Sequence, residues 1–211
     1  PQAPTAATHV VFIDQYIVAN DTSTGNEDFI VWSDVGDPTA WTATSSASPE
    51  GLPDNVNGVF VANKELFITG EQSIELWYND GVSPFRRIDG AFIQHGVIAP
   101  HTVKYVHELN TWLWLDHQRR LVKLNGRQPA IVSTPFDRTI QRLSTVNDAT
   151  GDLLRVDGRT FYLLTFPTEN VTYCYDFLMD SWSQWGSWDN DELNPIYDKY
   201  LGGITEFALT W

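Results

Sequence analysis

"LLRVDGRTFYLLT", residues 153–165, decides the fold, because it joins two apolar stretches through the dipeptide Asp157-Gly158. An Asp-Gly pair supplies the positive backbone φ angles that a two-residue hairpin turn of the primed type requires. The stretch therefore predicts two short antiparallel strands joined by a tight turn.

The second strand of this hairpin recurs along the chain at spacings of 46 to 50 residues. The copies are "QYIVAN" from Gln15, "ELFITG" from Glu65, "TWLWLD" from Thr111, "TFYLLT" from Thr160 and "EFALTW" from Glu206. Each of the first four follows another short apolar strand across a tight polar turn. Two more strands follow each hairpin: "FIVWS" and "WTATS", "SIELWY" and "FRRI", "RLVKL" and "PAIVS", "VTYCYDF" and "SWSQW".

Four-stranded units that repeat at this spacing are typical of a β-propeller, whose blades bury their faces against their neighbours. We therefore expect an all-β, β-propeller-like fold built from blades of about 46–50 residues. Because the fifth unit stops after its second strand, we expect an incomplete portion of a larger propeller; a β-sandwich with coincidental spacing is the alternative. The predicted boundaries are an extension at residues 1–8, four blades at 9–185, an acidic loop at 186–199 and the start of a further blade at 200–211.

The formal net charge of −14, from 27 acidic and 13 basic residues, should repel phosphate backbones and anionic membrane surfaces. We therefore expect no broad nucleic-acid-binding face. No apolar run approaches the ~20 residues that span a bilayer, so the sequence predicts no membrane anchor. The single cysteine, Cys174, excludes an intramolecular disulfide framework and is predicted to be a buried strand thiol.

The histidines and the acidic loop give no metal-binding pattern. His95, His101 and His107 lie six residues apart without an H-E-x-x-H frame, and His9 and His117 stand alone. Residues 189–192 lack the order of carboxylates in an EF-hand loop. We therefore predict no metal site and no cofactor.

The carboxylates do not indicate an enzyme. "WSDVGDPTAW", residues 32–41, resembles the Asp-box turn of sialidase-like propellers, but Asp34 follows Ser33 directly and is out of register. Glu71 and Glu75 are predicted on one strand face about 13 Å apart, which is wider than the carboxyl separation of glycoside hydrolases. A carbohydrate-binding or glycan-hydrolysing propeller remains the alternative function, and a scaffold for a cellular partner is a third.

Two pairs of adjacent arginines, Arg86-Arg87 and Arg119-Arg120, stand out in this acidic chain. Guanidinium groups suit pairing with the carboxylates of another subunit, but ordinary surface solvation explains such pairs equally well. The aromatic content of 13% also exceeds what one core needs, and surplus aromatic residues often lie at interfaces.

Several segments together resemble the packaged-DNA stabilization proteins of short-tailed bacteriophages, also called tail hub or nozzle proteins. They are "VFIDQYIV" (11–18), "SDVGDPTAW" (33–41), "GEQSIELWYNDG" (70–81), "PFRRIDGAFIQHGVIAPHTV" (84–103), "LNGRQPAIVST" (124–134) and "RTFYLLTFPTENVTYCYD" (159–176). The chain departs from the family pattern at Gln15, where a glycine is expected, and at Pro135, where a histidine is expected.

This resemblance implies a structural, non-enzymatic virion protein of the phage tail, assembled in the bacterial host cytoplasm. It implies a homo-oligomeric ring below the portal and its adaptor protein that extends and seals the DNA exit channel. The ring receives the tail needle or plug and the tailspikes or fibres. The acidic charge suits a conduit that contacts passing genomic DNA only transiently, without specific binding.

On this basis we expect residues 84–88 to form a joint with a neighbouring subunit or another tail protein. Phe85 is predicted to be the aromatic anchor, and Arg86 and Arg87 to fix the register of docking. The candidate interface also includes Trp77 and Tyr78. The family-motif residues beside it are Glu71, Ser73 and Glu75.

Overall fold

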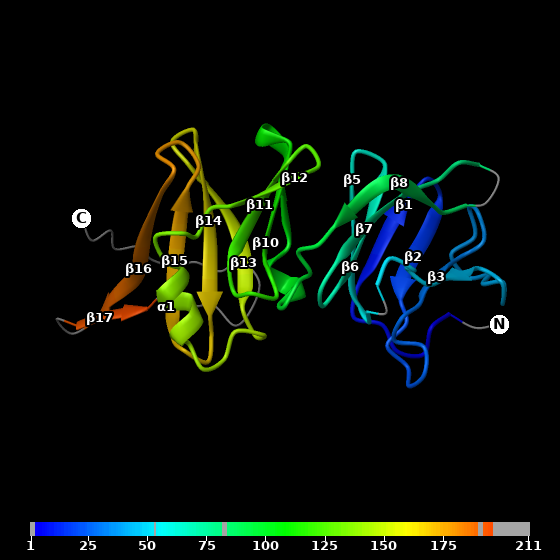
Figure 1. Cartoon of the computed structure of the whole chain (residues 1–211), viewed down its shortest axis with the longest axis horizontal. Helices are drawn as coiled ribbons and strands as arrows, with labels where there is room; N and C mark the ends of the chain where they lie inside the picture. The colour runs from blue at the N-terminus through cyan, green and yellow to red at the C-terminus, as the bar shows by residue number, and fades with distance from the viewer. Residues whose placement is uncertain (1–2, 53, 82–83, 190–191, 196–211) are drawn as a thin grey trace. The chain divides into compact units, whose positions relative to one another are not determined.

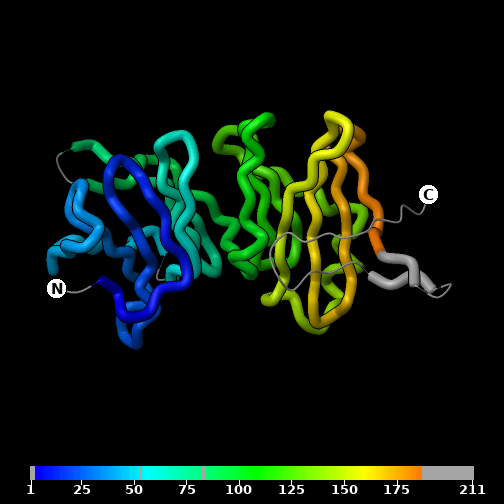
Figure 2. Tube along the Cα trace, turned by 180° about the vertical axis from the view of Figure 1, so that it is seen from behind, coloured from blue at the N-terminus to red at the C-terminus, as the bar shows by residue number. Residues whose placement is uncertain are grey.

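The computed structural model describes residues 3–52, 54–81, 84–189 and 192–195. The chain divides into two compact units, unit 1 at Pro1–Val97 and unit 2 at Ile98–Trp211. Within the described residues each unit contains two antiparallel sheets, and strands that follow one another in sequence lie side by side in each sheet (Figures 1 and 2). The predicted all-β, propeller-like fold of four-stranded blades is confirmed.

Unit 1 consists of two four-stranded sheets, both with strands in sequence order. The first sheet contains β1 (Val10–Ile13), β2 (Tyr16–Asn20), β3 (Ile30–Trp32) and β4 (Ser46–Ala47). The second sheet contains β5 (Val56–Ala62), β6 (Glu65–Gly70), β7 (Ile74–Tyr78) and β8 (Arg86–Ile93).

Unit 2 adds short helical turns to its two sheets. Its first sheet contains β9 (Lys104–Val106), β10 (Thr111–Leu115), β11 (Leu121–Asn125) and β12 (Gln128–Ile131), with the 3₁₀ turns η1 (Pro100–Thr102) and η2 (His107–Leu109) beside β9. The helix α1 (Asp137–Arg142) follows. The second sheet contains β13 (Thr150–Val156), β14 (Arg159–Phe166), β15 (Val171–Asp176), β16 (Ser181–Asp189) and β17 (Glu192–Pro195).

The hairpin that opens three of the sheets has the turn that the sequence predicts. Asp157 and Gly158 have φ angles of 50° and 74°, as a primed turn requires. The dipeptides Asp14-Gln15 and Asn63-Lys64 adopt the same positive φ angles without a glycine, at 46° and 71° and at 53° and 63°. The departure from the family pattern at Gln15 therefore leaves the turn unchanged.

Two predicted elements differ from the structure. "WTATS", residues 41–45, is not a strand, because the preceding residues 34–40 form a closed loop. In this loop the backbone N–H of Asp34 donates to the carbonyl of Ala40. The strand β4 starts only at Ser46. Part of the predicted acidic loop at 186–199 is instead a hairpin, in which β17 pairs with Gly186–Asp189 of β16. The further blade predicted at residues 200–211 lies outside the described residues.

The core of unit 1 lies between its two sheets. One face of the first sheet provides Ile13, Val18, Ile30 and Trp32. These residues pack against apolar residues of the second sheet and of the segment leading into β8, including Val59, Leu66, Ile68, Trp77 and Phe85. The core arises because alternate residues of a strand point to the same face.

The core of unit 2 is built in the same way. Leu113, Leu115 and Leu121 of the first sheet pack against Tyr162, Leu164 and Phe166 of the second. The hydroxyl of the buried Tyr162 donates to the carbonyl of Thr102 over 2.7 Å and ties η1 to β14. Burial raises the pKa of this hydroxyl.

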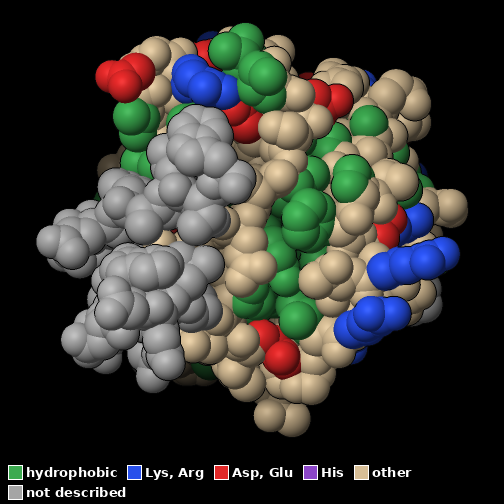
Figure 3. All heavy atoms as spheres, turned by 90° about the vertical axis from the view of Figure 1, so that its left-hand side faces the viewer, with side chains coloured by type: hydrophobic (Ala, Val, Ile, Leu, Met, Phe, Trp, Pro, Cys, Tyr) green, Lys and Arg blue, Asp and Glu red, His purple; other side chains and the backbone are tan. Residues whose placement is uncertain are grey.

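The other face of the second sheet of unit 2 carries a smaller apolar cluster. Its members alternate along the strands with the residues of the main core and are Leu154, Phe161, Leu163, Cys174 and Trp185. Figure 3 views the molecule from the left-hand side of Figure 1 and shows apolar side chains gathered near the centre of that surface.

Candidate interaction site

The turn between β6 and β7 is shaped by a single carboxylate. Asp54 accepts hydrogen bonds from the backbone N–H groups of Glu71 (2.9 Å), Gln72 (2.7 Å) and Ser73 (3.1 Å). A side chain at Gly70 would place its Cβ 2.4 Å from the Asp54 carboxylate, so glycine is needed there. The family-motif residue Ser73 and the neighbouring Gly70 therefore help to form this turn.

Glu71 and Glu75 do not form a pair on one strand face. Glu71 is exposed in the turn that precedes β7, whereas Glu75 lies within β7 and is only 1% exposed. The prediction placed both on the strand and is wrong for Glu71, because the turn held by Asp54 ends just before Ile74. The two carboxylates therefore serve different local structures.

Glu75 is a buried carboxylate that joins three parts of unit 1. It accepts hydrogen bonds from the backbone N–H of Gly51 (2.6 Å) and from Nε1 of Trp77 (2.8 Å). Nη1 of Arg87 lies 3.9 Å from its Oε1. A Cβ at Gly51 would approach the carboxylate to 2.6 Å, so this contact depends on glycine. Glu75 thereby fixes the loop after β4 to the β7–β8 hairpin.

The β7–β8 pairing contains a wide bulge beside this carboxylate. Trp77 pairs with Arg87 and Glu75 pairs with Phe92, so β8 has several more residues than β7 between the two pairs. Gly90, with φ of 73°, allows the chain to bend there. A hollow of about 440 Å³ lies beside the bulge, lined by Ala47, Ser48, Glu50, Glu75, Trp77, Phe85, Arg86, Arg87 and Asp89.

Phe85 is part of the core, and the prediction of an exposed aromatic anchor is wrong. It is 4% exposed and makes edge contacts with the rings of Tyr16 (5.5 Å between centroids) and Trp32 (5.3 Å). Trp77 is also buried, at 7% exposure. Both rings hold the start of β8 against the first sheet and leave no large surface for a partner.

Three of the candidate interface residues do lie on the surface. The side chains of Arg86 and Arg87 are 67% and 48% exposed, and Tyr78 is 37% exposed. Arg86 lies 3.9 Å from Asp80, a separation too long for a hydrogen bond. Tyr78 pairs with Arg86 across the hairpin, so these two side chains share one side of it, whereas Arg87 pairs with Trp77 and points to the other side, toward Glu75. We refer to these three exposed residues together as the β7–β8 surface.

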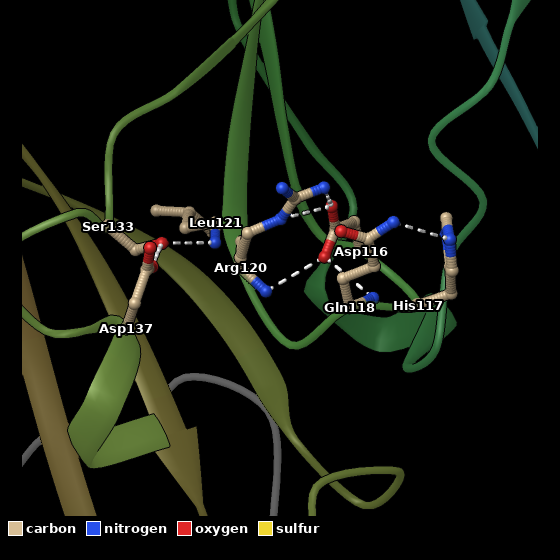
Figure 4. A network of polar contacts seen from close by, with 7 residues as sticks. All are labelled: Asp116, His117, Gln118, Arg120, Leu121, Ser133 and Asp137. Carbon is tan, nitrogen blue, oxygen red and sulfur yellow. Dashed lines mark hydrogen bonds and ion pairs between the residues drawn. The ribbon is translucent and has the colours of Figure 1, made fainter. Parts of the chain in front are cut away.

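Both arginines of the other pair bind groups of their own unit, and Figure 4 shows Arg120 beside Asp116. The guanidinium of Arg120 donates to the buried carboxylate of Asp116 over 2.8 and 3.1 Å. Asp116 also accepts the backbone N–H groups of Gln118 and Arg120. Arg119 donates to the carbonyls of Gln141 and Leu143 at the end of α1. Neither subunit pairing nor simple solvation describes this pair.

Two residues that organise the site, Gly51 and Asp54, carry no direct signal in the sequence. Both lie between β4 and β5, and their hydrogen-bond partners lie about 20 residues away in the chain. A glycine in such a segment suggests close backbone approach, but only the structure identifies Glu75 as the neighbour.

Other candidate groups contribute no chemistry to this surface. Within the described ranges no group of three or more His, Cys, Asp or Glu side chains could hold a metal ion. Cys174 is buried in β15 as predicted, and burial raises the pKa of its thiol to about 12. No helix in the described part of the chain is long and apolar enough to cross a membrane.

Comparisons with known proteins identify the family and the fold. A family model described as "Bacteriophage P22 Gp10, beta-propeller" matches residues 3–190. No curated protein sequence matches the chain.

Solved structures resemble the chain only at low identity. The AfRom2 CNH domain is 9% identical with a TM-score of 0.49, and the match covers 87% of this chain and 60% of that one. Hsv2 from Kluyveromyces lactis is 8% identical with a TM-score of 0.43, covering 82% and 59%; Hsv2 from K. marxianus is 9% identical with a TM-score of 0.45, covering 79% and 46%. The chain spans less than two thirds of the length of each of these structures.

Proposed function

Because this chain belongs to the bacteriophage P22 Gp10 β-propeller family, we propose that it forms part of a homo-oligomeric ring in the short tail of a phage. The chain is a phage structural protein with a propeller-like fold. The proposed ring lies below the portal and its adaptor, extends the DNA exit channel and seals it. The match of the family model over residues 3–190 carries this proposal.

The charge of the chain supports the role of a conduit. A net charge of −14 disfavours adhesion of the DNA phosphate backbone to the protein. DNA that leaves the capsid would therefore pass the ring with only transient contact. The tail needle or plug and the tailspikes or fibres are the proposed further partners of the ring.

We assign the β7–β8 surface, formed by Tyr78, Arg86 and Arg87, to contact with a neighbouring subunit or tail partner. The two guanidinium groups have no close hydrogen-bonded carboxylate among the contacts of the described residues. They are thus available to bind carboxylates of an acidic partner, and another copy of this chain is one such partner. Phe85 packs in the core beneath this surface and does not insert into the partner.

The first test is the native mass of the purified chain, alone and with a portal–adaptor complex, together with negative-stain images. We expect closed rings that dock coaxially on the adaptor. A monomer that does not bind the adaptor would overturn the proposed function, and glycan binding would then be the function to test.

Charge reversal tests the β7–β8 surface. The double variant Arg86→Glu/Arg87→Glu should lose assembly while its circular dichroism spectrum stays unchanged. A matched control is Arg127→Glu/Arg138→Glu, which changes the charge equally at two exposed arginines of unit 2. Normal assembly of the first variant would exclude this surface from the contacts.

A further inference from the structure

The sequence contains two Asn-Gly dipeptides, Asn57-Gly58 in unit 1 and Asn125-Gly126 in unit 2. An asparagine followed by glycine can lose its side-chain amide without an enzyme, because glycine has no Cβ to shield its backbone nitrogen from the asparagine side chain. The reaction requires that nitrogen to reach the side-chain carbonyl carbon of the asparagine. The surroundings of the two dipeptides therefore decide which of them reacts.

Asn57-Gly58 lies inside β5, and the fold holds both residues. Nδ2 of Asn57 donates to the carbonyl of Val97 over 2.6 Å, and its Oδ1 accepts from the hydroxyl of Thr69 over 2.8 Å. Gly58 is buried and pairs with Thr69 of β6. A Cβ added at Gly58 would lie 2.7 Å from Cε2 of Phe60, so this backbone is closely packed. The side chain of Asn57 therefore reaches the nitrogen of Gly58 only when β5 opens.

Asn125-Gly126 lies at the turn of the β11–β12 hairpin. Asn125 is the last residue of β11 and pairs with Gln128, so Gly126 and Arg127 form a two-residue loop. Gly126 has a φ of 61°, and a Cβ added there would meet no atom of a non-neighbouring residue within 4 Å. Asn125 and Gly126 are both exposed, and no hydrogen bond within the described residues holds the side-chain amide of Asn125. This amide is therefore free to turn toward the backbone of Gly126.

We propose that Asn125 is a site of spontaneous deamidation and that the fold protects Asn57. The backbone nitrogen of Gly126 loses its proton to a base in solution and attacks the side-chain carbonyl carbon of Asn125. A C–N bond forms, the side-chain amide takes up a proton from solvent and leaves as ammonia, and a succinimide ring remains. Water then opens the ring at either carbonyl and gives aspartate or isoaspartate. The reaction needs no co-reactant besides water.

The two products change the hairpin in different ways. Aspartate adds a negative charge two residues before Arg127 and leaves the backbone as it is. Isoaspartate carries the chain through its side chain, which adds a methylene group to the backbone between residues 125 and 126. The longer backbone no longer fits the two-residue loop that the pairing of Asn125 with Gln128 defines. We therefore expect isoaspartate to loosen the hairpin at its edge strand, β12.

Mass spectrometry of the whole chain, incubated in a warm, mildly alkaline buffer, tests the proposal. Samples are digested at intervals, and fragmentation of the peptides assigns each mass increase of about 1 Da to one residue. In the folded chain we expect Asn125 to convert at least about tenfold faster than Asn57, because Asn57 reacts only when β5 opens. Peptides with isoaspartate at residue 125 should elute separately from those with aspartate.

Two controls accompany this measurement. In guanidinium chloride both dipeptides are unfolded, and their rates should agree within about threefold. The variant Asn125→Gln has a longer side chain that forms a ring much more slowly. It should show no mass increase at residue 125 and an unchanged rate at Asn57.

Two results would overturn the proposal. The first is an equal rate at Asn57 and Asn125 in the folded chain. The second is a folded chain that keeps Asn125 intact while the unfolded chain converts, because the turn would then protect its amide as β5 protects that of Asn57. Neither result depends on assembly into a ring, so the outcome is independent of the proposed tail function.

Discussion

The same dipeptide, Arg-Arg, has opposite surroundings in the two units. In unit 2, Arg120 forms two hydrogen bonds to the buried Asp116, and Arg119 binds carbonyls at the end of α1. In unit 1, Arg86 and Arg87 lie 3.9 Å from their nearest carboxylates and remain largely exposed. The first pair holds a turn, whereas the second is available for an outside partner. The difference arises from the position of the carboxylate. Asp116 lies in the same turn as Arg120, whereas Glu75 lies in β7 beside the bulged pairing with β8.

The largest expected effect is at Asp116. Replacing Asp116 by Ala removes the acceptor of two backbone N–H groups and leaves the partly buried Arg120 without its counter-charge. We expect a loss of about 3 kcal/mol in the free energy of unfolding. Urea denaturation measures it, and a loss below about 1 kcal/mol would show that solvent replaces the pair.

The next effect is at Glu75, the carboxylate beneath the exposed pair. Glu75→Ala leaves the N–H of Gly51 and Nε1 of Trp77 without their acceptor, and we expect a loss of about 2 kcal/mol. Glu75→Gln retains an acceptor oxygen, so its smaller loss in the same denaturation experiment isolates the role of charge. Equal losses for the two variants would mean that the negative charge itself is needed.

A smaller effect is expected for Arg119→Ala. This variant removes the two hydrogen bonds to the carbonyls of Gln141 and Leu143, which should cost about 1 kcal/mol. The amide hydrogen exchange of α1 should increase at the same time, because Arg119 binds the end of that helix. Unchanged exchange would indicate that α1 is held by Ile140 in the core alone.

The smallest effect on stability is expected at Arg86 and Arg87, the residues whose replacement should affect assembly most. Arg86→Ala and Arg87→Ala should each change the free energy of unfolding by less than about 0.5 kcal/mol, because both guanidinium groups are largely exposed and lie too far from their carboxylates to form hydrogen bonds. Denaturation curves for these variants should overlay that of the wild type. A loss as large as that of Arg119→Ala would remove the contrast between the two pairs.

The blades could be predicted from the sequence because alternating apolar residues and tight turns are local signals. Asp157-Gly158 identified its hairpin directly. Gln15 and Lys64 carry no such signal, and only the repeat of the flanking strands indicated their turns. The prediction failed for residues 41–45, where a turn closed by Asp34 and Ala40 outweighs the strand pattern of Trp, Thr and Ala.

The candidate site could be predicted only in part. The sequence indicated the position of Arg86 and Arg87 but could not show that Phe85 points into the core, because that depends on Tyr16 and Trp32 of another sheet. The role of Arg120 also could not be predicted from the sequence. It depends on a turn that brings Asp116 back toward it, with Arg119 at a φ of 60°.

The bulge in β8 also bears on how the protein avoids aggregation. β8 ends its sheet, and a straight, uncharged end strand offers a row of backbone groups on which other chains can add strands. The bulge opposite Trp77 and Glu75 interrupts that row, and Arg86, Arg87 and Asp89 place charges along it. This edge therefore offers other chains no regular template on which to add a strand.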